Sequence, residues 1–323
     1  MLFIVATSGA HAADWRALTT NSTASLRGVA AVNSLVAWAT GTKGTVLRTN
    51  DSGKHWTSVQ VPNSASLDFR DIEAPDQTRA WLLASGPGDK SRVYFTHNAG
   101  ANWQLQLTNP DPTGFFDAIA LFNKRSGILL GDPVENRFVI FTTTDGVHWQ
   151  RRQGPEALPD EGAFAASGTC LIARANGEAW FGTGAARVFH SKDFGATWTV
   201  AQTPLRHAGK AAGVFSLAFF NSLRGIAVGG DYTKPTEAGA NVALTSDGGL
   251  TWHEPPQRPS GYRSAATYLS RTEIVVTGTN GTDISHDAGQ TWQPLTPLGY
   301  NAVTAHKRHL WAVGPEGRIA TAQ

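Results

Sequence analysis

The residues of this sequence best suited to chemistry are arginines and carboxylates that recur at one position of a repeated pattern. When the repeats are aligned, this position is occupied in turn by Arg27, Arg70, Asp117, Ala165, Ser216, Arg263 and Asn301. Side chains alternate along a strand, so these residues should project together near one end of a central channel. Guanidinium groups bind carboxylates and phosphates through paired hydrogen bonds. Three arginines and an aspartate at one mouth therefore predict a site for an anionic ligand.

Loops that connect neighbouring strands should add to this site. The loops at 88–92, 131–133 and 230–235 and the pair Asp160-Glu161 are expected on the same face, where irregular segments carry function. We predict nine ligand-binding residues, namely Arg27, Arg70, Asp71, Asp117, Glu161, Tyr232, Tyr262, Arg263 and Asn301. Each of them could instead form a structural ion pair or a turn hydrogen bond.

Three carboxylates on this face are candidates for acid and base catalysis: Asp117, Glu161 and Asp231. Glycoside cleavage needs two carboxylates at a defined separation, which a sequence does not provide. The chain contains no Gly-x-Ser-x-Gly, no His-Glu-x-x-His, no metal-spaced Cys/His cluster and no Gly-x-Gly-x-x-Gly that opens a helix. We therefore predict neither a metal nor a cofactor.

A motif of the form Ser/Thr-x-Asp-x-Gly-x-Thr-Trp must position these residues, because six copies of it span most of the chain. The copies lie at 49–56, 96–103, 143–149, 191–198, 245–252 and 285–292. In a tight hairpin the Asp carboxylate accepts backbone N–H groups, and Gly adopts the positive φ that other residues resist. We assign Asp51, Asn98, Asp145, Asp193, Asp247 and Asp287 to the scaffold and not to catalysis.

Each copy of this Asp box follows three short alternating segments, so each repeat reads as four strands. We predict an all-β, seven-bladed β-propeller over 13–323, with blades near 25–62, 67–108, 114–153, 162–204, 213–256, 261–296 and 299–323. The last unit lacks an outer strand, and the segment at 14–19 resembles one. Pairing of the two ends would close the ring and remove its exposed edges. An aromatic-rich column should pack between blades: Leu26, Phe69, Phe116, Phe164, Phe215, Tyr262 and Tyr300.

The amino terminus and the composition indicate an exported protein. Residues 1–12 resemble a signal peptide that ends in Ala10-His11-Ala12, although the usual preceding basic residues are missing. No later stretch of the 323 residues is apolar for long enough to span a bilayer. The net charge of +2 gives no indication of nucleic-acid binding. We expect a periplasmic or secreted monomer in which Cys170 is a buried small hydrophobic residue.

The Asp boxes, the seven units and the complementary ends together resemble the photosystem II stability/assembly factors, and the resemblance covers essentially the whole mature chain. It implies a chaperone-like binder of a protein segment, with a basic patch as the contact surface. Arg27, Arg70 and Arg263 are the residues here that match such a patch.

Asp boxes also occur in sialidases and in xyloglucan-cleaving glycoside hydrolases. Sialidases are similar in using an arginine triad, but they have six blades, and Leu26-Arg27-Gly28 matches the start of their triad poorly. Two functions therefore stay open. The preferred one is a binder of a protein or peptide, and the alternative is a carbohydrate-active enzyme that acts on an acidic glycan.

Overall fold

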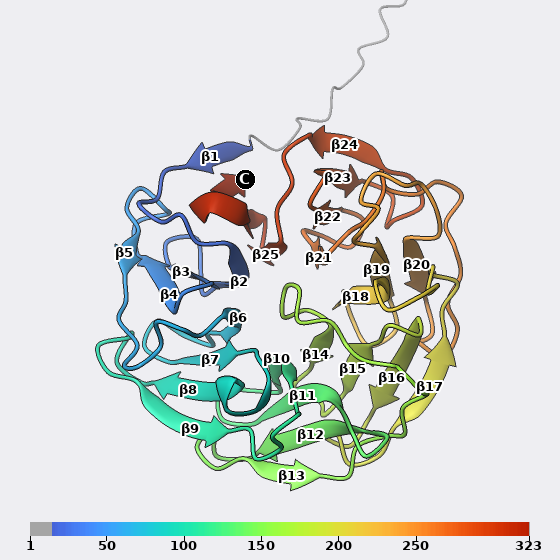
Figure 1. The fold of residues 1–323 in the computed structure, drawn as a ribbon. Coiled ribbons are helices and arrows are strands. Elements are labelled where there is room, and N and C mark those ends of the chain that lie inside the picture. Colours follow the sequence, from blue (N-terminus) through green and yellow to red (C-terminus); the bar gives the residue numbers. More distant parts are fainter. Residues whose placement is uncertain (1–14, 323) are drawn as a thin grey trace, which may run out of the picture.

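The computed structural model describes residues 15–322, whose strands form seven antiparallel sheets arranged in a ring (Figure 1). The inner strands, such as β2, β6 and β25, lie near the centre of the ring, and outer strands such as β5, β9 and β13 lie at its rim. This arrangement confirms the all-β, seven-bladed propeller. The proposed signal peptide at 1–12 lies outside the described residues.

The first four blades follow one another in chain order. Blade 1 contains β2 (Leu26–Ala31), β3 (Ala37–Gly41), β4 (Thr45–Thr49) and β5 (Thr57–Ser58). Blade 2 contains β6 (Phe69–Glu73), β7 (Ala80–Ala84), β8 (Arg92–Thr96) and β9 (Gln104–Thr108). Blade 3 contains β10 (Phe116–Leu121), β11 (Gly127–Val134), β12 (Arg137–Thr143) and β13 (Gln150–Arg152). Blade 4 contains β14 (Leu171–Ala173), β15 (Ala179–Gly182), β16 (Arg187–Ser191) and β17 (Thr199–Gln202).

The remaining three blades complete the ring. Blade 5 contains β18 (Ala212–Phe219), β19 (Gly225–Asp231) and β20 (Val242–Thr245). Blade 6 contains β21 (Ala265–Tyr268), β22 (Ile274–Gly278), β23 (Gly281–Ser285) and β24 (Gln293–Thr296). Blade 7 contains β25 (Ala302–His306), β26 (His309–Val313), β27 (Ile319–Ala322) and β1 (Arg16–Leu18). Two single 3-10 turns, η1 (Gly88–Lys90) and η2 (Pro315–Gly317), lie in loops.

Blade 5 differs from the four-stranded prediction because its outer strand is reduced to one bridge, between Leu244 and His253. Pro255 and Pro256 follow after Glu254. Proline has no N–H group to donate to a neighbouring strand, so the ladder stops there.

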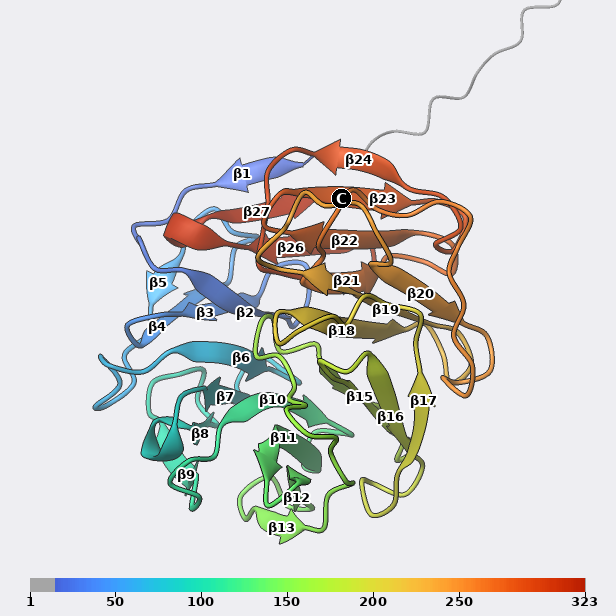
Figure 2. The ribbon, with the colours of Figure 1, turned by 45° about the vertical axis from the view of Figure 1, so that its right-hand side comes forward.

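The two ends of the chain close the ring, as predicted. β1 pairs antiparallel with β27, with Ala17 opposite Ala320, and Figure 2 shows these two strands side by side. The indole N–H of Trp15 also donates to the hydroxyl of Tyr300 over 2.9 Å. Strand pairing and a buried side-chain contact therefore join the first and last segments of the described chain.

Five of the six Asp boxes form the same turn, shown by the fifth copy, and the box at 143–149 forms a turn that is one residue shorter. The Thr245 hydroxyl donates to Asp247 and accepts the N–H of Gly249, and Asp247 accepts the N–H of Thr251. Gly249 has a φ of 89°, which glycine adopts at little cost. The Trp252 indole then donates back to the Gly249 carbonyl over 3.1 Å. The boxes are therefore self-contained structural turns, as the sequence predicted.

The box turns also join neighbouring blades. Trp38 of β3 is fully buried and contacts Trp103, which follows the box of the next blade, with ring centroids 6.1 Å apart. The indole N–H of Trp81 in β7 donates to the carbonyl of the box residue Gly146. The ring closes in the same way, since Trp311 of blade 7 contacts Trp56 of blade 1 at 5.7 Å. Tryptophans on second strands therefore fix the angle between adjacent blades by packing against the following box.

Candidate functional site

One residue near the start of most inner strands faces a central cavity of about 450 Å³. In blades 1, 2, 3 and 5 a β-bulge occurs at this residue, so its side chain leaves the regular alternation. In blades 6 and 7 the corresponding residue directly precedes the inner strand. The residues that occupy this position in the six blades are Arg27, Arg70, Asp117, Phe215, Ser264 and Asn301.

The segment 163–168 supplies the contribution of blade 4 and crosses the middle of the ring. The carbonyl of Ala165 accepts Nη1 of Arg70 from blade 2 over 3.3 Å, and the hydroxyl of Ser167 donates to the carbonyl of Ser264 from blade 6 over 2.8 Å. Phe164 stacks on Phe215 of blade 5 with centroids 3.7 Å apart. This segment therefore contacts blades 2, 5 and 6 and lines the cavity between them.

The cavity has a charged side built from blades 1 to 3. Arg70 donates through Nε to Asp68 over 2.8 Å. Arg27 is different, because its Nε is buried without a hydrogen-bond partner among residues 15–322. Burial and the charge of Arg70 lower the pKa of Arg27, while Asp68 and Tyr262 partly offset them. A guanidinium group with a buried N–H that lacks a partner favours the binding of an anion.

Two carboxylates lie next to the arginines. Asp117 is 1% exposed, and its Oδ2 has no hydrogen-bond partner within the described part of the chain. Burial and the neighbouring Asp132 raise the pKa of Asp117 well above its usual range, against the effect of Arg70. Asp132 lies in β11 and accepts the N–H of Ala163 over 2.9 Å. Burial also raises the pKa of Asp132.

Aromatic rings form the other side of the cavity. Phe215 makes edge contacts with Tyr262 at 4.8 Å and with Tyr232 at 6.1 Å, in addition to its stacking on Phe164. Burial raises the pKa of the Tyr262 hydroxyl. An anion-binding side, an acidic side and an aromatic wall therefore meet in one cavity, an arrangement suited to binding an amphipathic segment.

Comparisons with known proteins agree with this architecture. A family model described as the BNR/Asp-box repeat matches residues 283–294, the sixth box. A structure of YCF48 bound to D1 peptide is 17% identical, with a TM-score of 0.68 over 95% of this chain and 96% of that chain. YCF48 from Cyanidioschyzon merolae is 13% identical, with a TM-score of 0.71 over 96% and 98%. U3-55K is 11% identical, with a TM-score of 0.67 over 96% and 98%.

The chain is an Asp-box propeller of seven blades. The resemblance inferred from the sequence is thereby supported at the level of the fold, which is what similarity at these identities establishes. No curated protein matches the sequence significantly.

The structure brings six of the nine predicted ligand-binding residues to the cavity: Arg27, Arg70, Asp117, Tyr232, Tyr262 and Asn301. Asp132, Phe164, Phe215 and Lys210 also line it but were missed as site residues. The Gly131-Asp132-Pro133 loop did indicate the region of Asp132. Phe164 and Phe215 were assigned to packing between blades because aromatic residues at strand positions usually belong to the core.

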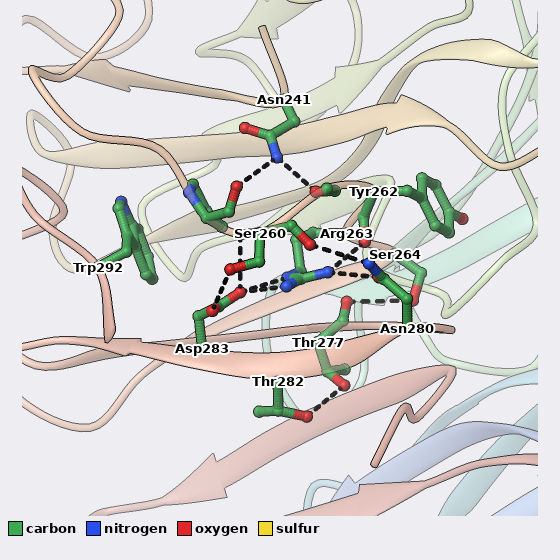
Figure 3. A network of polar contacts seen from close by, with 12 residues as sticks. Asn241, Ser260, Tyr262, Arg263, Ser264, Thr277, Asn280, Thr282, Asp283 and Trp292 are labelled. Carbon is green, nitrogen blue, oxygen red and sulfur yellow. Dashed lines mark hydrogen bonds and ion pairs between the residues drawn. The ribbon is translucent and has the colours of Figure 1, made fainter. Parts of the chain in front are cut away.

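Arg263 was predicted beside Arg27 and Arg70 but lies in the interior of blade 6. It is 1% exposed and forms an ion pair with Asp283, and its Nη1 donates to Asn280 over 2.7 Å. Figure 3 shows its guanidinium group inside this network, with the ring of Tyr262 pointing away from it. The repeat alignment was shifted by one residue in blades 5 and 6, and such a shift exchanges the two faces of a strand.

The same shift explains Ser216, and Ala165 differs for another reason. Ser216 is fully buried and its hydroxyl accepts the N–H of Ala266, so Phe215 occupies the cavity position instead. Ala165 belongs to the crossing segment and not to an inner strand, because β14 begins only at Leu171. Of the expected packing column, Leu26, Phe69, Phe116 and Tyr300 are fully buried, whereas Phe164, Phe215 and Tyr262 line the cavity.

The remaining predicted carboxylates do not line this cavity. Glu161 forms an ion pair with Arg187 and accepts the hydroxyl of Thr183, beside an adjoining hollow of about 880 Å³ that shares Asp132, Ala163, Phe164 and Lys210 with the cavity. Asp231 accepts the N–H and hydroxyl of Thr233 in a surface turn, and the hydroxyl contact lowers its pKa. Asp71 is buried between blades 2 and 3, where it accepts two backbone N–H groups. The three candidate catalytic residues therefore do not converge on one site.

Proposed function

We propose that this protein is a binding scaffold that holds a segment of another protein in its central cavity. A carboxylate of that segment lies against Arg27 and Arg70, and an apolar side chain next to it contacts the aromatic wall. The observation that carries this proposal is the half-buried Arg27 side chain in the cavity, whose buried Nε has no hydrogen-bond partner among residues 15–322. YCF48, a photosystem II assembly factor with the same fold, was solved with a bound D1 peptide, which supports a peptide as the ligand class.

We further propose that the scaffold acts as a monomer outside the cytoplasm. The residues at 1–12 support export, because a short apolar run leads to a small-x-small cleavage site there. Among residues 15–322, no helix has the length and apolar character that crossing a membrane requires.

The anion subsite can be tested with two probes that differ only in charge, N-acetylphenylalanine and its amide. Calorimetric titration of the wild type should detect tighter binding of the carboxylate probe. Arg27→Gln should weaken this binding by about 10-fold or more, since a hydrogen bond to a charged group contributes about 1.5–3 kcal/mol. Arg125→Gln is the matched control, because Arg125 is exposed and does not line the cavity.

Equal binding of the two probes by the wild type, or unchanged affinity in Arg27→Gln, would contradict the proposal. The enzymatic alternative is tested in parallel with a panel of glycosides of acidic sugars. Turnover that is lost in Asp117→Asn would replace the binding scaffold by a carbohydrate-active enzyme. Absence of turnover together with retained binding of N-acetylphenylalanine supports the scaffold.

A further inference from the structure

The cavity is also lined by an acidic group, Asp117, whose buried Oδ2 has no hydrogen-bond partner in the described part of the chain. Asp117 as a whole is almost completely buried. An unpaired buried carboxylate is costly, so a site that retains one gains strongly when a donor arrives. A bulge in β10 lies at this residue, so its side chain leaves the regular alternation of the strand and lines the cavity.

The charged groups nearest to Asp117 do not donate a hydrogen bond to its Oδ2 in the described part of the chain. Asp132 from β11 adds negative charge, and the pKa of the Cys170 thiol before β14 is raised by burial and by the nearby Asp117. Arg70 from β6 attracts Asp117, but its hydrogen bonds go to Asp68 and to the carbonyl of Ala165. Lys210 lines the cavity, and its ammonium group forms an ion pair with Asp160 over 2.8 Å.

The surroundings indicate an organic cation as the missing partner. Among residues 15–322, no group of three His, Cys, Asp or Glu side chains could hold a metal ion. Two carboxylates are too few protein ligands for a dedicated metal cage, but they suit the three donors of an ammonium group. Phe164, Phe215 and Tyr262 line the same cavity, and aromatic rings attract cations and pack against methylene chains.

We propose that Asp117 and Asp132 form a subsite for a protonated primary amine, with its methylene chain against the aromatic wall. A lysine side chain of the bound segment is the occupant that fits the proposed function, on which this choice of source rests. The cavity would then bind two charged groups of its ligand, a carboxylate at Arg27 and an ammonium group at Asp117.

Binding of the amine has a measurable protonic signature. Burial and Asp132 raise the pKa of Asp117, so the empty cavity holds this carboxyl group protonated to higher pH than usual. An ammonium group stabilises the carboxylate, so Asp117 loses its proton to the buffer as the O–H bond is replaced by an N–H···O hydrogen bond. Affinity for the amine should therefore increase as the pH rises.

The experiment titrates the wild type with N-acetyl-lysine methylamide, with its uncharged analogue N-acetyl-norleucine methylamide, and with n-butylamine. Calorimetry at a series of pH values from about 4 to 9, in two buffers of different ionisation enthalpy at each pH, counts the protons released. We expect the lysine probe to bind at least about 10-fold more tightly than the norleucine probe, with proton release. Tighter binding of the lysine probe than of n-butylamine assigns the site to a peptide lysine, and the reverse assigns it to a free amine.

Asp117→Asn should weaken binding of the lysine probe by about 10-fold or more and abolish proton release. Asp231→Asn is the matched control, since this exposed turn residue lies outside the cavity and should change neither quantity. Proton release in the wild type does not depend on the stability of any variant, so it tests the proposal independently. Equal affinity for the lysine and norleucine probes, or binding without proton release at any pH of the series, overturns the amine subsite.

The two proposals fail separately. If N-acetylphenylalanine binds and the lysine probe does not, the amine subsite is wrong and the scaffold function stands. If the lysine probe binds and N-acetylphenylalanine does not, the anion subsite is wrong and the acidic subsite stands.

Discussion

Asp71 shows how a single carboxylate joins two blades. Its Oδ1 accepts the N–H of Ile72 in its own strand, and its Oδ2 accepts the N–H of Ile119 in the next blade, each over 2.8 Å. Gly168 of the crossing segment lies against it, and a Cβ added there would be 2.1 Å from Oδ1. Glycine is therefore required at 168 by the close approach of this side chain.

The environment of Asp71 predicts a dependence of stability on pH. Burial raises its pKa to about 7, against the effect of the two N–H groups. An unfolded aspartate has a pKa of about 3.9, so between these values the folded state binds more protons than the unfolded state. Stability therefore falls as the pH rises from about 4 to 7, and the cost is complete above pH 7.

We expect the wild type to have a lower free energy of unfolding at pH 8 than at pH 5 in urea titrations. Asp71→Asn should lower the free energy of unfolding at pH 5 by about 1–3 kcal/mol, because its NH2 group would face one of the two backbone N–H groups. The difference from the wild type should shrink at pH 8. Asp89→Asn, at an exposed residue, should reproduce the wild-type dependence. An unchanged slope in Asp71→Asn would show that this carboxyl does not titrate in that range.

At the level of the elements, the Asp-box turn and the second strand of the preceding blade act as one packing unit. Gly100 has a φ of 88°, and a Cβ added to it would lie 2.6 Å from Val59 Cγ1 and 3.1 Å from Trp38. Both contacts belong to blade 1, whereas Gly100 belongs to the box of blade 2. The glycine therefore serves the turn and also leaves room for the neighbouring tryptophan.

A comparison of Gly100→Ala with Gly209→Ala should distinguish the cost of the turn conformation from the cost of the contact between blades. Gly209 has a φ of 84°, but a Cβ there meets nothing within 4 Å. Left-handed backbone should cost each alanine about 1–2 kcal/mol, and overpacking should add about 1–3 kcal/mol at Gly100 alone. Chemical denaturation of both variants measures the difference. Equal losses of stability would mean that the contact between blades adds nothing to the turn.

At the level of the whole molecule, the ring depends on a short strand far from its partner in sequence. β1 supplies three residues to blade 7, and without them β27 would be an unpaired edge. Exposed edges promote association through strand pairing. The closing pair also completes the packing around Trp311 and Gly53, because a Cβ added to Gly53 would lie 2.6 Å from Leu18.

A variant that lacks residues 1–18 should therefore be less stable and should self-associate. We expect its thermal midpoint to fall by several degrees, since loss of a few kcal/mol shifts a domain of this size by roughly 2–4 °C per kcal/mol. A variant that lacks residues 1–14 retains every pair between β1 and β27 and is the control. Scanning calorimetry and light scattering measure both effects. Identical midpoints and masses would show that closure by β1 is dispensable.

The sequence by itself determined the architecture, because each Asp box is a local device. The hydroxyl of Thr245, the carboxylate of Asp247 and the glycine that follows satisfy one another within a few residues, so spacing alone identifies the turn. Repetition then determined the number of blades, and the resemblance of the segment at Trp15 to an outer strand predicted the closure.

Only the tertiary structure decided which side chains reach the cavity. Bulges, a one-residue offset in two blades and the crossing of segment 163–168 place Phe215 in the cavity and Arg263 in an internal ion pair with Asp283. A strand alternates its faces at every residue, so an error of one position reverses the environment of a side chain. Contacts between distant blades, such as Arg70 with Ala165, determine these offsets and leave no local pattern in the sequence.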